Sequence, residues 1–286
     1  MGHRGGAMGG TDAFVEHREL LFSIVYGMLG TVADTEDVLQ ETWLSWAPRT
    51  DVGNPRAYLV RVAVNHALRR RERAGRETYP GQWLPEPLVS DAADEVVRGE
   101  EFSMAVLVVL ETLSPAERAV FVLHEVFGYA HPEIATILGR SPAAVRQLAH
   151  RAREHVEARR PRFTVDPRTR RRVTERFLAA ALGGDLEELL RVLAPDVTLW
   201  TDGGGKGPAR SLAPVHGGES VARLLVAVAK GVPSTVDVRF RRVHGDPAVL
   251  LFADDAPFAV LVLEVRSDRV GGVYSITNPD KLTRVG

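Results

Sequence analysis

The sequence predicts a multidomain protein with two all-α domains followed by a C-terminal α+β domain. Three observations support this fold class. The chain has 286 residues, enough for about two domains of roughly 150 residues each or three small ones. Up to about residue 160 its apolar residues recur at helical spacing, whereas from residue 196 they follow a strand-like pattern. A proline-rich stretch between the two helical parts is typical of a linker.

The composition is that of an ordinary globular protein, with 45% hydrophobic and 26% charged residues. No run approaches the roughly 20 apolar residues of a membrane helix, so we expect no membrane partner. Residues 1–10 are glycine-rich without an apolar signal segment, which predicts a flexible tail, with Met8 as an alternative start. The absence of cysteine excludes disulfides and thiolate metal ligands. We expect a cytoplasmic protein without metal or cofactor.

The charge distribution is more informative than the net charge of −1. Residues 61–73 contain five arginines and one glutamate, and residues 146–172 contain ten arginines and three acids. Acids crowd residues 34–41 and again residues 86–101. Alternating blocks of this kind indicate a polyanion as the partner of the arginines and a basic protein surface as the partner of the acids. Solvated helix faces are the alternative for any single block.

Three helices are expected in a first domain, residues 11–75. An amphipathic pattern predicts a helix over about 11–29. Asp34 is expected to N-cap the second helix, which has acids in its first turn. Asn54-Pro55 begins the third, which runs into the arginine cluster. Residues 76–103 then predict an extended, pliant linker.

A second helical domain is expected over residues 104–160. Ser114 and Glu117 flank Pro115 as in a capping box, which marks the start of a helix. Further on, His131–Gly139 predicts a short helix that ends at glycine.

A second helix, from Ala143 to Val156, follows a turn in which Ser141 is the N-cap and Pro142 the first helical residue. Small Ala135 lets the two helices approach, so this pair predicts a helix-turn-helix. Arginine and glutamine suit base edges and phosphates, which favours DNA recognition over a plain helical hairpin. The polar side chains expected on the solvent face of the second helix are Arg146, Gln147, His150, Arg151 and Arg153.

The last part, residues 168–286, changes class. Helices are expected near 168–182, 185–193 and 218–229, and strands near 196–201, 235–243, 248–253, 257–266 and 269–276. Helices followed by a meander of antiparallel strands predict an α+β domain.

Three segments in this order resemble the extracytoplasmic-function (ECF) sigma factors, the promoter-recognition subunits of bacterial RNA polymerase. Residues 113–118 and 125–129, with the helix-turn-helix, resemble region 4, which reads the upstream promoter element. Residues 34–42 resemble region 2.2, and residues 61–65 resemble the segment that captures the melted downstream element. The resemblance spans residues 11–158 and implies core RNA polymerase and promoter DNA as partners.

The resemblance also implies where these partners bind. Region 2.2 docks on the β′ clamp helices, and region 4 is expected at the β flap. The implied polymerase-binding residues are Asp34, Asp37, Gln40 and Glu41. The implied downstream-element residues are Tyr58, Arg61, Asn65, Arg69 and Arg70. Asn65 takes the base contact, and Tyr58 occupies a place where the family often has tryptophan, with a core role as its alternative. The five polar residues of the second helix of the helix-turn-helix are the implied upstream-element contacts.

The C-terminal part resembles a SnoaL-like domain of the NTF-two-like superfamily, a cone of curved sheet and helices. Three short segments resemble the SigJ-like subgroup of ECF sigma factors, which carries this domain as a fused extension. They contain the implied regulatory contacts Trp83, Asp202, Gly203, Gly204, Gly205, Lys206, Asn278, Pro279, Asp280 and Lys281. The subgroup implies regulation in cis, without a dedicated anti-sigma protein. We expect the three segments to lie together as a latch; ordinary surface turns are the alternative.

Catalysis by the C-terminal domain is not expected. The available acid–base candidates, Asp202, His216, Asp254 and Asp255, are scattered along the sequence, and a fold alone does not carry an activity. Ligand sensing remains open. The alternative to a sigma factor is a ligand-responsive helix-turn-helix regulator that does not act through core polymerase. Only the sigma factor needs the acidic helix at residues 34–41.

Overall fold

The computed structural model describes residues 10–49, 52–74, 79–90, 102–157, 165–207, 211–232 and 235–285. The chain divides into two compact units. The first contains Met1–Glu77 and Val109–Arg159, and the second contains Thr78–Val108 and Arg160–Gly286. The expected flexible tail, apart from Gly10, and the linker acids beyond Ser90 lie outside the described residues. No helix in the described ranges is long and apolar enough to cross a membrane.

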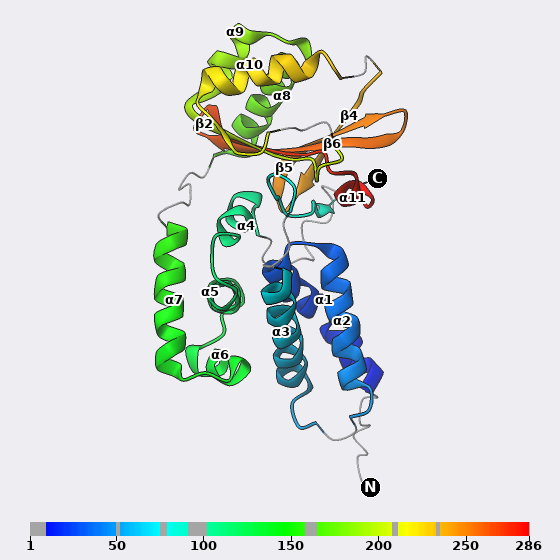
Figure 1. Ribbon diagram of the computed structural model, residues 1–286, viewed down its shortest axis with the longest axis vertical. Coiled ribbons are helices and arrows are strands. Elements are labelled where there is room, and N and C mark those ends of the chain that lie inside the picture. Colours follow the sequence, from blue (N-terminus) through cyan, green and yellow to red (C-terminus); the bar gives the residue numbers. More distant parts are fainter. Residues whose placement is uncertain are drawn as a thin grey trace. The chain divides into compact units, whose positions relative to one another are not determined.

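The first part of the first unit consists of three packed helices, α1 (Gly10–Leu29), α2 (Val32–Trp46) and α3 (Pro55–Ala74) (Figure 1). The expectation that Asp34 caps α2 is wrong. Gly30, with φ of 74°, ends α1 so abruptly that α2 begins at Val32, after an extended Thr31. Asp34 therefore lies in the first helical turn, where it accepts a 2.5 Å hydrogen bond from the Thr31 hydroxyl.

The second part of this unit contains α5 (Pro115–Phe121), a π-helical segment η1 (Val122–Val126), α6 (His131–Leu138) and α7 (Pro142–Glu157). The capping box at Ser114 and Glu117 is confirmed. Gly139 ends α6 in the left-handed conformation, with φ of 62°. Ser141 accepts a bond from the Ala144 amide at 3.2 Å, so α6 and α7 form the expected helix-turn-helix. In addition, α3 packs against both α5 and α6.

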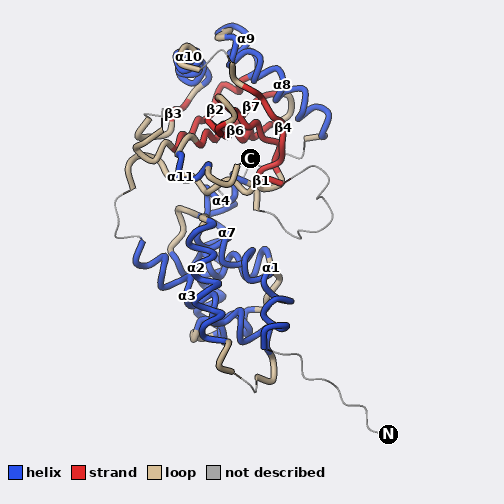
Figure 2. The backbone as a smooth tube through the Cα atoms, turned by 90° about the vertical axis from the view of Figure 1, so that its right-hand side faces the viewer, coloured by secondary structure: helices blue, strands red, loops and turns tan. Residues whose placement is uncertain are grey.

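The second unit is built on a seven-stranded sheet in the order β1-β4-β5-β6-β7-β2-β3. All neighbours pair antiparallel except β2 and β7, which are parallel. The strands are β1 (Val89–Ser90), β2 (Leu193–Asp202), β3 (Val215–His216), β4 (Asp237–Val243), β5 (Asp246–Ala253), β6 (Ala256–Arg266) and β7 (Arg269–Ile276). Figure 2 shows the strands together in this one sheet. The predicted α+β class is confirmed.

Helices cover both faces of the sheet. On one face lie α8 (Pro167–Gly183), α9 (Leu186–Val192) and α10 (Gly218–Ala229), seen together above the strands in Figure 1. Phe177 and Val221 pack there against strand residues such as Leu199. The other face is covered by Leu84, by α4 (Met104–Leu110) and by α11 (Pro279–Leu282), through Met104 and Leu282.

The part of the predicted linker that precedes residue 91 is not a pliant tether. Residues 79–90 belong to the second unit, where Leu84 is completely buried in the core beneath the sheet. Its last two described residues form β1, in which Val89 pairs with Val243 of β4. The apolar side chains between the prolines therefore make this stretch part of the domain.

Candidate functional site

The acidic face of α2 is the expected polymerase-binding surface. Asp37, Gln40 and Glu41 are exposed on it, and Asp34 is half-buried. Arg70 reaches this face from α3, with its guanidinium 2.7 Å from Asp34 and 2.6 Å from Asp37. A charge-assisted pair of this kind is stronger than a neutral hydrogen bond. Arg70 thus pairs with the acids of this surface here, and its expected contact with a DNA phosphate stays a prediction.

The expected downstream-element residues lie along α3. The half-buried Tyr58 ring packs with its centroid 5.7 Å from that of the Trp46 ring, and the guanidinium groups of Arg49 and Arg61 lie over it at 5.6 and 5.7 Å. Its hydroxyl donates to the Ser45 carbonyl at 3.3 Å. Tyr58 is therefore an integral part of the helix packing that also offers a cation–π surface.

Asn65, the expected base-contacting residue, is already engaged. Its side-chain amide donates to the Arg61 carbonyl at 2.7 Å and to the Ile137 carbonyl at 2.9 Å. Ile137 belongs to α6 of the helix-turn-helix, 72 positions further along the chain. In this arrangement the amide is occupied by α6. Arg61 and Arg69 remain exposed on the same helix.

Helix α7 presents all five expected upstream-element residues to solvent. Two of its arginines are paired with acids of neighbouring elements: Arg151 with Glu117 at 2.8 Å, and Arg153 with Glu125 at 2.5 Å. His150 lies 3.6 Å from Glu154 on the same helix. Arg146 and Gln147 stand at the N-terminal end of α7, the end that usually reaches base edges in a helix-turn-helix.

A buried ion network joins the two helical parts, and the sequence analysis missed it. The side chain of Arg118 is completely buried, where it pairs with Glu111 and donates to the Gly27 carbonyl at 2.8 Å. Arg71 of α3 pairs with the same Glu111 at 2.9 Å. Burial lowers the pKa of Arg118 to about 10. One Arg118 amino group has no hydrogen-bond partner among the described residues, so the guanidinium is not fully satisfied.

The three segments expected to form a latch meet around Asp202, at the end of β2. Its fully buried carboxylate accepts bonds from the Tyr79 hydroxyl at 2.7 Å, the Leu84 amide at 2.8 Å and the Lys281 ammonium at 2.7 Å. Lys281 also donates to the Leu84 carbonyl and lies over the Trp83 ring, 4.2 Å from its centroid. Burial, and secondarily the bond to Asp202, raise the pKa of Tyr79.

The glycine-rich loop after Asp202 is shaped by this site. Gly204 has a φ of 58°, and a Cβ there would collide with the Asn278 side chain. Asn278 donates to the Tyr79 hydroxyl at 2.8 Å and caps the short helix α11 that begins at Pro279. Lys206 pairs with Asp280 at 2.6 Å on the surface. The three segments thus lie together, as expected, while their regulatory role stays a prediction.

The acid–base candidates of the second unit do not converge. Asp202 is committed to the contacts above, and His216 is exposed and bonded to Thr198 at 3.0 Å. Asp254 and Asp255 form the exposed turn between β5 and β6. In the part of the chain that the structure describes, no group of three or more such side chains could hold a metal ion.

Comparison with known proteins shows two family matches and close whole-chain relatives. Residues 13–77 match the model "Sigma-70 region 2", and residues 103–156 match "Sigma-70, region 4". The chain is 39% identical to the ECF RNA polymerase sigma factor SigJ of Mycobacterium tuberculosis over 93% of this chain and 91% of that protein. It is 35% identical to the probable ECF RNA polymerase sigma factor SigI of the same species, over 94% and 93%.

Among solved structures, the crystal structure of M. tuberculosis SigJ superposes with a TM-score of 0.76 at 34% identity, covering 96% of this chain and 98% of that one. The match includes both helical regions and the C-terminal α+β domain. The chain therefore belongs to the ECF sigma factors, transcription initiation factors that bind core RNA polymerase and promoter DNA.

Proposed function

We propose that the C-terminal domain regulates this sigma factor in cis by holding the segment between regions 2 and 4. The buried Asp202 carboxylate carries the proposal, because three of its bonds come from Tyr79, Leu84 and Lys281. Two of these residues belong to the inter-region segment and the third to α11. A charge that is buried and fully hydrogen-bonded is costly to separate from its partners. The segment is thereby held to the C-terminal domain.

The same proposal includes a second restraint, within the sigma regions themselves. While the Asn65 amide donates to the Ile137 carbonyl, it cannot contact a flipped base. The network of Arg118, Glu111 and Arg71 holds region 4 against region 2. Engagement of the downstream element then requires α6 to leave α3. The acidic face of α2 is the proposed site for the β′ clamp helices, and α7 is the proposed reader of the upstream element.

Regulation from within the chain makes a separate anti-sigma protein unnecessary. We assign no catalytic role to the C-terminal domain, since its acid–base candidates are dispersed, and we place the protein in the cytoplasm with RNA polymerase. The alternative function, a DNA-binding regulator that does not act through polymerase, does not explain why residues 13–77 match sigma-70 region 2.

The test is run-off transcription with purified core polymerase and the full chain carrying Asp202→Ala. The variant leaves the Lys281 ammonium buried without its acid, which is strongly unfavourable. We expect the inter-region segment to be released, so that hydrogen exchange of residues 79–90 accelerates and the transcript yield changes several-fold. Asp202→Asn, which keeps the side-chain shape, guards against a folding failure and should act in the same direction.

Asp237→Ala is the matched control, because Asp237 forms only an exposed pair with Arg239 at 2.7 Å on β4. Exposed pairs contribute little to stability, so exchange and transcription should stay at the wild-type level. Faster exchange of residues 79–90 in the Asp202 variants with an unchanged transcript yield would show that the contact is structural only, and the proposal would be abandoned.

A further inference from the structure

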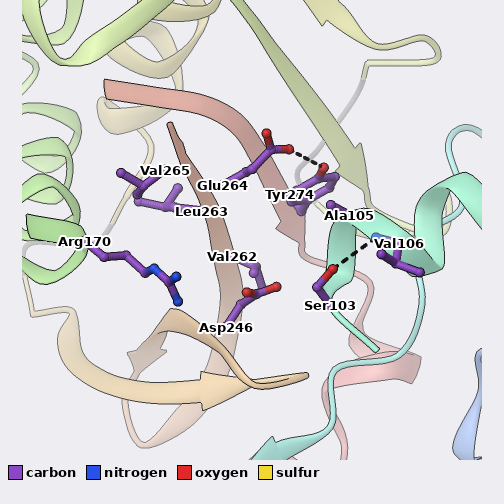
Figure 3. A pocket seen from close by; sticks show the side chains of 10 residues that line it. All are labelled: Ser103, Ala105, Val106, Arg170, Asp246, Val262, Leu263, Glu264, Val265 and Tyr274. Atoms are coloured by element: carbon purple, nitrogen blue, oxygen red, sulfur yellow. Dashed lines mark hydrogen bonds between the residues drawn. The ribbon is translucent and has the colours of Figure 1, made fainter. Parts of the chain in front are cut away.

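The second unit contains a pocket with a volume of about 190 Å³ that the function described so far does not use. It is lined by β6 and β7 of the sheet, by the start of β5, by α8 and by the first turn of α4 (Figure 3). Its lining is divided about evenly between polar and apolar side chains, and the apolar ones include Val262 and Leu263 of β6 and Ala105 and Val106 of α4. Apolar walls combined with convergent polar groups are typical of small-molecule sites.

Two charged side chains face each other across this pocket without touching. Figure 3 shows the Arg170 guanidinium extending toward the Asp246 carboxylate. No ion pair joins them among the described residues, and the hydrogen bonds that they do make are to backbone. Arg170 donates to the Val165 carbonyl at 3.4 Å, and Asp246 accepts from the Met104 amide at 3.2 Å. Both groups therefore keep hydrogen-bonding capacity for something that lies between them.

The state of Asp246 supports a bound group. Burial raises its pKa to about 6, although the bond from Met104 and the charge of Arg170 oppose this shift. The carboxylate is thus mostly ionised at neutral pH in a half-buried position, where the Met104 amide donates to it and no cation of the described residues is in contact. A further donor would stabilise the charged form, and perturbed groups of this kind in a pocket indicate a functional site.

The second carboxylate of the pocket is already satisfied. Glu264 accepts from Arg266 at 2.5 Å and from the Tyr274 hydroxyl at 3.3 Å, and the Tyr274 ring stacks on Trp200 with centroids 4.7 Å apart. Glu264 and Tyr274 are thus hydrogen-bonded to each other in the wall of the pocket. Asp246 thus offers an acceptor and Arg170 a donor to a molecule in the pocket.

We propose that this pocket binds a small uncharged molecule whose apolar body carries a carboxamide-type edge. Its carbonyl oxygen accepts from Arg170, its N–H group donates to Asp246, and its apolar body packs on Val262 and the first turn of α4. A carboxylate in the same place would be repelled by Asp246. An amine would offer no acceptor to Arg170. Uncharged molecules with adjacent acceptor and donor satisfy both residues at once.

The pocket is connected to region 4 through α4. The Asp246 carboxylate binds the amide of Met104, the first residue of α4, and Ser103 accepts a bond from the Val106 amide at 3.3 Å. The helix then continues to Leu110, and the N-cap of α5 follows at Ser114. A ligand therefore touches α4, the first helix of the segment that matches region 4. This regulatory consequence rests on the proposed function, whereas the binding site itself does not.

Benzamide, benzoate and benzylamine are the probes, each titrated into the full chain with ¹³C-labelled methionine methyl groups. We expect benzamide to shift the Met104 signal in a saturable way at millimolar concentration, and the two charged probes to bind at least tenfold more weakly. Met28, buried in the first unit, is the internal reference and should not move. A Met104 signal that does not respond to benzamide would mean that the pocket holds only water and would overturn the proposal.

Asp246→Asn and Arg170→Met test the two polar contacts separately, and each should weaken benzamide binding about tenfold or more. Asparagine retains an acceptor for the Met104 amide, so α4 stays anchored. Arg171→Met is the matched control, because Arg171 is exposed on the same helix and pairs with Glu175. Unaltered binding in both pocket variants would sink the assignment.

Run-off transcription with saturating benzamide distinguishes binding in the pocket from an effect of that binding on transcription. A change in yield with the wild type that is absent with Asp246→Asn supports the regulatory route. Benzamide binding without any change in yield overturns the route and leaves the site standing. The Asp202 variants, tested without benzamide, report separately on whether the C-terminal domain regulates transcription at all.

Discussion

A single imidazole illustrates how one side chain couples this fold to pH. His244, only 5% exposed, lies in the turn between β4 and β5. Its backbone amide donates to the carbonyl of Leu88, in the inter-region segment of residues 79–90, at 3.2 Å. Burial lowers its pKa from 6.5 to about 3, against a smaller opposing effect from the Glu86 backbone. Between these two values the unfolded chain binds a proton that the folded chain does not. Folding stability therefore falls as pH decreases through this window.

Replacing His244 with asparagine removes this titration. Asparagine tolerates the left-handed backbone at this position, where φ is 53°. Between pH 8 and pH 5 we expect the wild type to lose about 2 kcal/mol more of its unfolding free energy than His244→Asn, at about 1.4 kcal/mol per pKa unit. Urea unfolding of both proteins at the two pH values measures the difference. Parallel pH profiles would show that His244 titrates normally in the folded chain.

At the scale of an element, α7 separates its arginines into two kinds. Arg151 and Arg153 are each held by a glutamate of a neighbouring helix, so part of their charge is compensated in place. Arg146 is exposed at the end of α7 that is expected to enter the groove. The contributions of these residues to DNA binding should therefore differ, although all three are arginines on one helix.

Arg146→Ala should weaken binding to the upstream promoter element more than Arg153→Ala does. We expect a loss of about 1–3 kcal/mol if Arg146 reads a base, or a salt-dependence slope that is smaller by about one if it holds a phosphate. Loss of Arg153 also leaves the negative charge of Glu125 uncompensated near the DNA. For Arg153→Ala, the effect should therefore appear in the salt-dependence slope at least as clearly as in the sequence specificity. Fluorescence anisotropy over a salt series measures both quantities, with Glu125→Gln as the control that leaves Arg153 unpaired. Equal effects of the two alanine variants would contradict the distinction.

Elements were predictable where their signals are local. Ser114, Gly139 and Ser141 mark helix ends through bonds within a few residues, and the structure has helices where these signals predict them. Strands β1 and β3 were missed because each has two residues, and its only signal is a distant partner. Val89 pairs with Val243, which no pattern in the linker indicates. The site residues around Asp202 were found through their resemblance to a family, since their spacing carries no signal.

At the scale of the whole chain, the contacts between residues far apart in the sequence were the least predictable. Arg118 binds a carbonyl 91 positions away, and Asn65 binds one 72 positions away. A sequence shows Asn65 as a polar residue on a helix and Arg118 as part of a capped helix start. Which partner each finds depends on the docking of region 4 on region 2, which is set by packing rather than by propensity. The expected base contact of Asn65 and its bond to the Ile137 carbonyl therefore exclude each other.

The buried network predicts how this closed arrangement opens. Glu111→Ala would leave Arg118 buried without its acid, and breaking a buried pair in this way costs about 3–5 kcal/mol. Separation of regions 2 and 4, which hydrates Arg118, relieves that penalty. We therefore expect the full-length variant to bind core polymerase at least tenfold more tightly than the wild type, and its radius of gyration in small-angle scattering to increase.

Glu111→Gln, which keeps the shape and a hydrogen-bond acceptor, should shift both quantities in the same direction by less, and it covers the case in which the alanine variant fails to fold. Glu219→Ala is the control, since Glu219 forms an exposed pair with Arg223 on α10. Polymerase affinity and scattering that match the wild type in both Glu111 variants would mean that region 4 leaves region 2 without resistance from this network. The restraint would then lie with the segment held at Asp202, the other contact through which we propose that the chain regulates itself.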